Sequence, residues 1–344
     1  MDIFLTGGSG FVGQHMITRL VADGHTVRAL ARSPESARRV EQAGATAVLG
    51  DLADLHGPDP AGHPASTRPG PAWLGALDGC DAVVHAAARM AFWGPDAGFE
   101  RDNHRPTVAL FTAAAAAGVG RFVLVSAAAV STDRNRGPAV VSETTPTGRP
   151  LIAYGRVKLA TERALADLST PGTTLVVLRP PLIWGPGMTT LAEAARAAAA
   201  GQFAWIDGGR HVIDFVHVTN LAAATSAALT RGRDRGVYYV TDGSPMPIRD
   251  LFTPLFGAAG ADVSRARSVP SAVAVPVAAL LDGVWRLLRR PTPPPLDRWL
   301  VAVMGRNRSY DISRARAELG YRPGVTVAAG LAELRGSGST AGVA

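Results

Sequence analysis

Cysteine and lysine are almost absent from this chain. Cys80 is the single cysteine among 344 residues, which excludes an internal disulfide framework and a zinc site built from cysteines. We expect no metal site, and the composition is typical of a reducing, cytoplasmic compartment. Lys158 is the single lysine among 35 basic residues. Because an ammonium is compact and has a tunable pKa, the lone lysine indicates a role that a guanidinium cannot fill.

Long hydrophobic runs and concentrated basic stripes are missing too. The longest apolar stretch, residues 271–281, contains Pro276 and is shorter than the roughly 20 residues that cross a bilayer. The chain begins on a strand pattern without the features of a signal peptide. We therefore expect no integral membrane span. The net charge of +7 comes from scattered arginines without interleaved aromatics, which argues against nucleic acid as a partner.

Strand-like and helix-like segments alternate along the first half of the chain, a pattern typical of βαβ units and a parallel sheet. This predicts an α/β fold of the Rossmann type, with a doubly wound sheet. A proline-rich stretch, residues 56–72, interrupts the alternation and is predicted to be a surface loop. The expected strands are residues 2–6, 26–31, 45–49, 82–86, 121–126 and 173–178, and the expected helices are residues 11–23, 102–117 and 153–168.

A glycine-rich turn joins the first strand to the first helix. Gly7, Gly10 and Gly13 permit a tight turn, close approach of a pyrophosphate and close packing of helix on strand. The helix N-terminus at Phe11 and Val12 supplies amide donors and a partial positive charge. The turn therefore predicts a dinucleotide site.

The end of the second strand predicts which dinucleotide binds. Arg32 stands where proteins that select NAD usually carry an acid for the ribose hydroxyls. Arg38 and Arg39 follow about two helical turns later and could close over a 2′-phosphate. These residues predict NADP(H) as the cofactor. Four further residues follow the third and fourth strands at positions suited to the adenine and the cofactor backbone: Asp51, Leu52, Ala86 and Ala87.

Tyr154 and Lys158 form a candidate pair for proton transfer. Residues four apart on a helix share a face, so the phenol and the ammonium should lie side by side. A free phenol has a pKa of about 10, and a nearby cation is expected to lower it. The same lysine can hold the ribose of a nicotinamide nucleotide. The pair predicts catalysis together with cofactor binding.

These motifs together resemble the extended short-chain dehydrogenases/reductases. The resemblance also rests on residues 179–187, 214–220 and 310–323, and covers about residues 1–325. It is strongest for the branch similar to 3β-hydroxysteroid dehydrogenases, which includes bacterial 2-alkyl-3-oxoalkanoate reductases. That branch implies a sheet of about seven strands, cofactor contacts from Pro181 and Ile183, a small C-terminal substrate lobe, and hydride transfer between a nicotinamide and a ketone or secondary alcohol.

The resemblance suggests a division of the chain. Residues 1–178 would form the NADP-binding domain, with a strand and helix returning to it from about 214–241. Residues 179–335 would form most of the substrate lobe, and the Gly- and Ser-rich residues 336–344 a flexible tail.

One position departs from the family pattern. A serine or threonine usually hydrogen-bonds the reacting carbonyl, and counting back from Val130 places Ala127 there instead. Either Ser126 or Ser131 takes over this role, or Tyr154 holds the carbonyl alone. Because losing such a donor can cost about 10²–10³-fold in rate, a non-catalytic NADP-binding sensor is one alternative function.

The expected substrate is small and hydrophobic, such as a steroid, a polyketide or a 3-oxoacyl compound. Nucleotide-sugar epimerases and dehydratases, the other alternative, typically carry an arginine where this chain has Ile213. An aromatic lining suits an apolar ligand, although each ring could equally be lobe core. The candidate substrate residues are Phe92, Trp93, Trp184 and Trp205.

Residues 273–288 form an apolar helical segment followed by Arg289 and Arg290. It is either a flap over the pocket that touches a membrane surface or a lobe helix packed on the sheet domain. We expect a monomer or a homodimer. The primary hypothesis is an NADP(H)-dependent ketoreductase or alcohol dehydrogenase that works through Tyr154 and Lys158.

Overall fold

A computed structural model describes residues 1–55, 70–132 and 139–340. A sheet of seven parallel strands lies at its centre, in the order β12-β7-β5-β4-β1-β2-β3. This order confirms the Rossmann-type prediction. The strands are β1 (Asp2–Thr6), β2 (Thr26–Ala31), β3 (Thr46–Leu49), β4 (Ala82–His85), β5 (Arg121–Val125), β7 (Thr174–Arg179) and β12 (Gly236–Tyr239).

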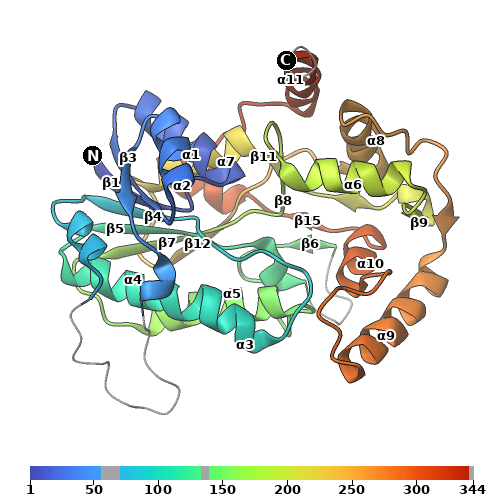
Figure 1. Ribbon diagram of the computed structural model, residues 1–344, viewed down its shortest axis with the longest axis horizontal. Coiled ribbons are helices and arrows are strands. Elements are labelled where there is room, and N and C mark those ends of the chain that lie inside the picture. The colour runs from blue at the N-terminus through green and yellow to red at the C-terminus, as the bar shows by residue number, and fades with distance from the viewer. Residues whose placement is uncertain (56–69, 133–138, 341–344) are drawn as a thin grey trace.

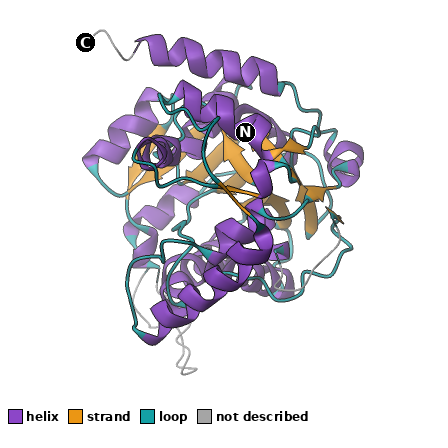
Figure 2. Ribbon diagram, turned by 90° about the vertical axis from the view of Figure 1, so that its right-hand side faces the viewer, coloured by secondary structure: helices purple, strands orange, loops and turns teal. Residues whose placement is uncertain are grey.

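Helices cover both faces of this sheet (Figures 1 and 2). One face carries α1 (Phe11–Ala22), α2 (Pro34–Gln42) and α7 (Val218–Ala228), and the other carries α4 (Arg105–Ala116) and α5 (Ala153–Asp167). Side chains of a strand alternate between the two faces. Thus Ile3 and Leu5 of β1 pack with α1, whereas Phe4 packs on the α4 side. Burial on both faces explains why the central strands are apolar throughout.

The last part of the sheet is built late in the chain. After β7, the strand β8 (Leu182–Trp184) pairs with β11 (Phe215–His217) outside the main sheet. The chain then returns through α7 and adds β12 beside β7. Residues 215–239 thus add β12 to the sheet and α7 to its face, where α7 packs against α1.

The lobe is assembled from short helices and two-stranded ribbons beside the sheet (Figure 1). Its core contains Trp184, Trp205, Phe215 and Phe256. The helices are α6 (Thr189–Ala199), α8 (Ile248–Ala258), α9 (Ser271–Leu287) and α10 (Arg298–Met304). The strand pairs are β9 (Trp205–Ile206) with β14 (Ser268–Val269), β10 (Val212–Ile213) with β13 (Met246–Pro247), and β6 (Val140–Val141) with β15 (Ser309–Tyr310).

Helix α9 packs mainly on α10 at the outer end of the lobe, so it is a lobe helix that does not lie on the sheet. Within the described residues, none of the helices is both long enough and apolar enough to cross a bilayer.

Two loop predictions differ from the structure or fall outside it. Of the predicted loop 56–72, residues 56–69 lie outside the described residues, and Ala72–Leu77 form a short 3-10 helix. The predicted flexible tail from residue 336 is in part helical, because α11 (Val327–Thr340) continues through Gly336. A further short helix, α3 (Asp96–Phe99), leads through a π-turn at Glu100–His104 into α4.

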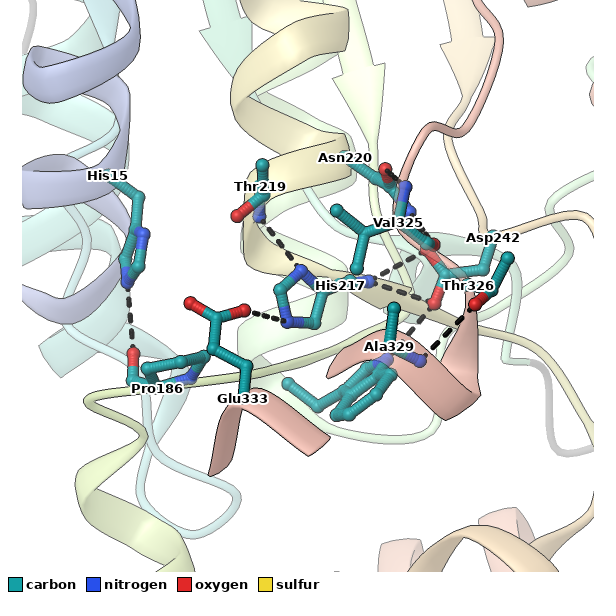
Figure 3. A network of polar contacts seen from close by, with 11 residues as sticks. His15, Pro186, His217, Thr219, Asn220, Asp242, Val325, Thr326, Ala329 and Glu333 are labelled. Atoms are coloured by element: carbon teal, nitrogen blue, oxygen red, sulfur yellow. Dashed lines mark hydrogen bonds and ion pairs between the residues drawn. The ribbon is translucent and has the colours of Figure 1, made fainter. Parts of the chain in front are cut away.

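A polar network holds the segment that leads into α11. The Asn220 side chain accepts from the Gly324 amide at 2.9 Å. It also accepts from the Val325 amide at 2.9 Å and donates to the Val325 carbonyl at 2.8 Å (Figure 3). Asp242 accepts from the His217 amide and from the Asn220 side chain. The buried His217 ring lies 3.8 Å from the Glu333 carboxylate of α11. These contacts tie the last helix to α7 and β11.

Candidate active site

A large cavity lies where the carboxyl ends of the strands meet the lobe. Its volume is about 1690 Å³, more than the 300–1,000 Å³ typical of a site for one small ligand. It therefore has room for a dinucleotide and a substrate together. Segments that follow β1, β2, β3, β4, β5 and β7 line it, at the edge where ligands bind in open α/β sheets.

The glycine turn has the shape that a pyrophosphate needs. Gly7 has φ of +80°, and a Cβ there would lie 2.7 Å from the Ala87 amide nitrogen. A Cβ at Gly13 would lie 2.0 Å from the Gly7 carbonyl oxygen. Gly10 begins α1 without a side-chain cap, so the first-turn amides at Phe11 and Val12 stay open to the cavity that both residues line. This cradle fits an anionic group at a helix N-terminus.

At the far end of the cavity, Arg32 follows β2 and is an exposed part of the wall, together with Asp51 and Leu52. Asp51 also caps the following turn by accepting from the Ala53 amide at 2.9 Å. The exposed Arg38 does not line the cavity. Its neighbour Arg39 pairs with Glu35 at 2.6 Å on α2. The structure thus places one of these three arginines on the cavity wall.

The wall beyond β4 is formed by Ala86 and Ala87, with His85 beneath them. The buried His85 ring bridges Thr6 and Thr107, with both contacts at 2.7 Å. Burial lowers the pKa of His85 to about 3, so the ring is neutral. Its role in joining β1 to α4 was not anticipated from the sequence. The feature of the sequence that could have indicated this role is a histidine at the end of an otherwise apolar strand.

Tyr154 and Lys158 lie in the first two turns of α5 and both line the cavity. The Lys158 Nζ lies 5.9 Å from the centre of the Tyr154 ring and donates to the Val125 carbonyl at 3.0 Å. Val125 is the last residue of β5, so the strand end fixes the ammonium beside the phenol. Both side chains are nearly inaccessible to solvent. An ammonium has three donors, which leaves two for other partners.

Burial shifts the acid–base behaviour of both groups. It raises the pKa of Tyr154, which is opposite to the direction expected from a neighbouring cation alone. Burial lowers the pKa of Lys158 to about 8, and the Glu162 carboxylate opposes that shift. At neutral pH the phenol therefore carries its proton, which is the form able to donate one.

Ser126 lines the cavity, but its hydroxyl has another partner than the predicted substrate carbonyl. Its hydroxyl donates to the Glu162 carboxylate, and because a serine has one O–H donor, none is left for a substrate carbonyl. Glu162 in turn pairs with Arg179, whose Nη2 lies 2.6 Å from Oε2. Arg179 also donates to the Tyr239 hydroxyl at 3.3 Å. This buried network under the cavity floor was not predicted from the sequence.

Ser131 does not supply the missing hydroxyl proton either. It donates to the Ala128 carbonyl at 2.8 Å. Ala127, Ala128 and Ala129 form the wall beside Tyr154. Of the three groups considered from the sequence, Tyr154 is the one that keeps a proton available to a carbonyl oxygen in the cavity.

The substrate side of the cavity is apolar. Phe92 lines it and stacks on Trp299, with 4.0 Å between ring centres. Trp299 was not predicted from the sequence, because it lies more than 200 residues further along the chain than Phe92. Further apolar side chains of this wall come from three lobe helices (α6, α8 and α10), from the residue before α6 and from the loop before β9: Met188, Leu191, Phe203, Ile248, Phe252, Phe256, Leu300, Val303 and Met304.

Three of the four predicted substrate residues lie away from this wall. Trp184 is fully buried and donates to Asp242 at 3.0 Å, on the side of β8 that faces α11. Trp205 is fully buried and donates to the Val263 carbonyl at 3.0 Å. Trp93 lies outside and donates to the Arg290 carbonyl at 3.1 Å. Pro181 and Ile183, predicted to contact the cofactor, do line the cavity.

A cation, Arg308, lies beside the apolar lobe wall. Ile213 lines the cavity where nucleotide-sugar enzymes were expected to carry an arginine, and Arg308 is bridged to it from the neighbouring strand. The Arg308 Nη1 donates to the Ser131 carbonyl at 2.7 Å. No acidic side chain of the described residues forms an ion pair with Arg308. Among the same residues, no cluster of histidine, cysteine and carboxylate side chains could hold a metal ion.

Comparison with known proteins defines the family. The profile of the NAD dependent epimerase/dehydratase family matches residues 3–240. The chain belongs to this family. This membership confirms the resemblance to extended short-chain dehydrogenases/reductases.

Two relatives match almost the whole chain. A 4-hydroxy-2-methyl-3-oxo-4-farnesyl-3,4-dihydroquinoline-1-oxide ketoreductase of Stigmatella aurantiaca is 36% identical over 340 residues, covering 98% of this chain and 97% of the relative. A 2-alkyl-3-oxoalkanoate reductase of Stenotrophomonas maltophilia (strain K279a) is 32% identical over 349 residues, covering 98% and 99%. Among solved structures, a dTDP-glucose 4,6-dehydratase of Streptomyces venezuelae with NAD bound superposes with a TM-score of 0.72 at 23% identity, covering 99% of this chain and 98% of that one. The solved structure supports the fold.

Proposed function

We propose that this family member is an NADP(H)-dependent ketoreductase that acts on a hydrophobic ketone. The observation that carries the proposal is the position of Tyr154 and Lys158 in one cavity, between the glycine cradle and an apolar lobe wall. The names of the two relatives, a ketoreductase and a 3-oxoalkanoate reductase, support the same reaction class.

Tyr154, Lys158 and Ser126 have different roles in the proposed reaction. A bound nicotinamide dinucleotide supplies the hydride. Tyr154 donates its phenolic proton to the carbonyl oxygen, and burial keeps that proton in place at neutral pH until the oxygen accepts it. Lys158 stabilises the phenolate left behind, and its remaining N–H donors hold ribose hydroxyls. Ser126 acts through Glu162 by holding that carboxylate one turn beyond Lys158.

The cofactor preference rests on Arg32. This guanidinium lies on the cavity wall at the end of β2, where it can pair with a 2′-phosphate. Such a charge-assisted hydrogen bond contributes on the order of 1.5–3 kcal/mol. Arg32→Asp should weaken NADPH binding by one to two decades or more, because it adds repulsion to the lost pairing. NADH binding should change far less.

The matched control for this experiment is Arg38→Asp, which makes the same charge change on an exposed arginine off the cavity wall. Arg38→Asp should weaken NADPH binding much less than Arg32→Asp does. Equal affinity of the wild type for NADH and NADPH would show that Arg32 is only a surface charge.

The wall also indicates the substrate class. Rings and aliphatic side chains suit a long alkyl or polycyclic ligand, and Arg308 offers one cation for an acidic group such as the carboxylate of a 3-oxo acid. A nucleotide sugar would need this wall to hold a diphosphate, and Ile213 favours the apolar ligand instead.

Tyr154→Phe tests the proposed reaction directly. The variant should bind NADPH as the wild type does and lose turnover of hydrophobic ketones, which is followed at the nicotinamide absorbance. Tyr310→Phe is the control, because it removes a second buried phenol from the same cavity and should keep turnover. Tight NADPH binding without oxidation across chemically diverse ketones would favour the sensor alternative, and unchanged turnover in Tyr154→Phe would refute the mechanism.

A further inference from the structure

An apolar stripe runs along the outer face of α9. Val273, Val277, Leu280, Val284 and Leu287 recur at intervals of four and three residues, which places them on one side of the helix. All are exposed, and Leu280 and Leu287 expose 68% and 82% of their surface. The buried side of the helix is narrow, with Ala274 and Ala278 as its fully buried residues. The fold therefore leaves the larger side chains of this helix in solvent.

A basic cluster follows at the C-terminal end of the stripe. Arg286 pairs with Asp282 at 2.9 Å, and the next turn carries Arg289 and Arg290. No acidic side chain of the described residues forms an ion pair with either of these two. Exposed Leu288 lies between the stripe and the arginines. Apolar side chains beside unpaired arginines complement an interface of acyl chains and anionic headgroups.

The mouth of the cavity opens beside this helix. Met90, Phe92 and Leu300 line the cavity and are also exposed, so they form an apolar rim. The loop that carries Met90 and Phe92 is tied to the end of α9 through Trp93. Its indole nitrogen donates to the Arg290 carbonyl at 3.1 Å, and the Arg286 guanidinium lies 4.9 Å from its ring centre. The rim therefore lies beside the C-terminal end of α9, and rim and stripe together make up the exposed apolar surface at this end of the lobe.

We infer that this surface docks the protein on an anionic lipid bilayer, with the cavity mouth turned toward the lipid. A second copy of the chain is a poorer occupant, because stable interfaces bury about 800 Å² on each partner from roughly 20–30 residues. The stripe and rim together offer fewer than half as many side chains. A bilayer needs no such area, since a few inserted side chains and nearby arginines are enough for reversible binding.

Co-sedimentation with vesicles tests the docking surface. The full chain is incubated with vesicles of phosphatidylcholine containing phosphatidylglycerol, or of phosphatidylcholine alone. The wild type should partition onto the anionic vesicles at least tenfold more strongly. Leu280→Ser with Leu287→Ser should reduce this partition at least tenfold. Arg289→Glu with Arg290→Glu should do the same, because each arginine near an anionic surface changes partition about fivefold.

Two matched controls lie far from the stripe. Leu49→Ser removes an apolar side chain that is 65% exposed at the end of β3, on the outermost strand of the sheet. Arg335→Glu reverses an exposed charge on α11, at the opposite end of the molecule from α9 (Figure 1). Both variants should partition as the wild type does. NADPH affinity, measured on every variant, shows that each one is folded.

Three results would overturn the inference. The first is a wild type that stays in solution with both kinds of vesicle. The second is equal binding by the stripe variants and their controls. The third is a dimer, detected by sedimentation velocity, that the Leu280→Ser and Leu287→Ser changes dissociate, because the stripe would then be an interface between copies.

Discussion

Replacing Glu162 with glutamine removes the charge that holds the network beneath the active site. In the folded chain the Arg179 and Glu162 side chains are only 7% and 5% exposed, and Arg179 approaches both carboxylate oxygens, at 3.2 Å from Nε and 2.6 Å from Nη2. Glutamine has nearly the same shape, so the change leaves the packing intact. It leaves the Arg179 guanidinium buried beside a neutral amide. Breaking a buried pair in this way costs about 3–5 kcal/mol of unfolding free energy.

Urea unfolding of wild type and variant measures that cost. Glu35→Gln is the matched control, because the Arg39–Glu35 pair has the same 2.6 Å separation but is 54% and 67% exposed. An exposed pair contributes about 0–1 kcal/mol. A double variant, Glu162→Leu with Arg179→Met, should recover much of the loss, since apolar side chains of similar volume can replace a buried pair. If Glu162→Gln costs no more than Glu35→Gln, the pair does not stabilise the fold as argued.

The same variant has a second, kinetic readout. Glu162 opposes the effect of burial on Lys158 and so favours its ammonium form. Without that carboxylate, Lys158 should lose its proton at a lower pH than the value of about 8 in the wild type. The alkaline limb of the rate profile should then move toward neutrality. An unmoved alkaline limb together with lost stability would assign Glu162 a purely structural role.

Three further predictions concern other parts of the molecule. Burial lowers the pKa of His85 to about 3 and the pKa of His217 to about 4. Because the same histidines bind protons near pH 6.5 in the unfolded chain, the melting temperature should fall as the pH drops from about 6.5 to 4. A melting temperature that does not change over this pH range would contradict the prediction. Gly13→Ala would place a Cβ 2.0 Å from a backbone carbonyl and should weaken dinucleotide binding at least tenfold in a fluorescence titration, whereas Gly75→Ala, with open space around it, should not. Ser126→Ala should lower the melting temperature while keeping turnover within about tenfold, because its hydroxyl serves Glu162; complete loss of turnover would place that hydroxyl on the substrate.

The sheet and the juxtaposition of Tyr154 with Lys158 could be predicted from local sequence. Strands buried on both faces are apolar throughout, and the glycine turn has few alternatives between a strand and a helix. Tyr154 and Lys158 needed only helical spacing to be placed together. In each case, the information lies within a few consecutive residues.

The substrate wall could not be predicted in the same way. Core and cavity lining are both apolar, so Trp184 and Trp205 look the same in sequence as Phe252 and Trp299, although the first two are core and the last two line the cavity. Which ring faces the cavity depends on how separate lobe helices pack. The pairing of Glu162 with Arg179 could not be predicted from the sequence either, because it is a tertiary contact between a helix and the following strand.

The late return of the chain to the sheet has a consequence for its synthesis. The edge strand β12 and the helix α7 that covers α1 are made only after β8, α6 and the lobe strands β9 and β10 have emerged. A nascent chain that stops at residue 178 has its glycine turn and Tyr154, but α1 lacks the cover of α7 and the outer edge of β7 is unpaired. Such a fragment presents an open strand edge, which promotes aggregation. The two units are therefore interdependent, and cutting the chain between them should yield two insoluble pieces that recover a folded sheet only when they are refolded together.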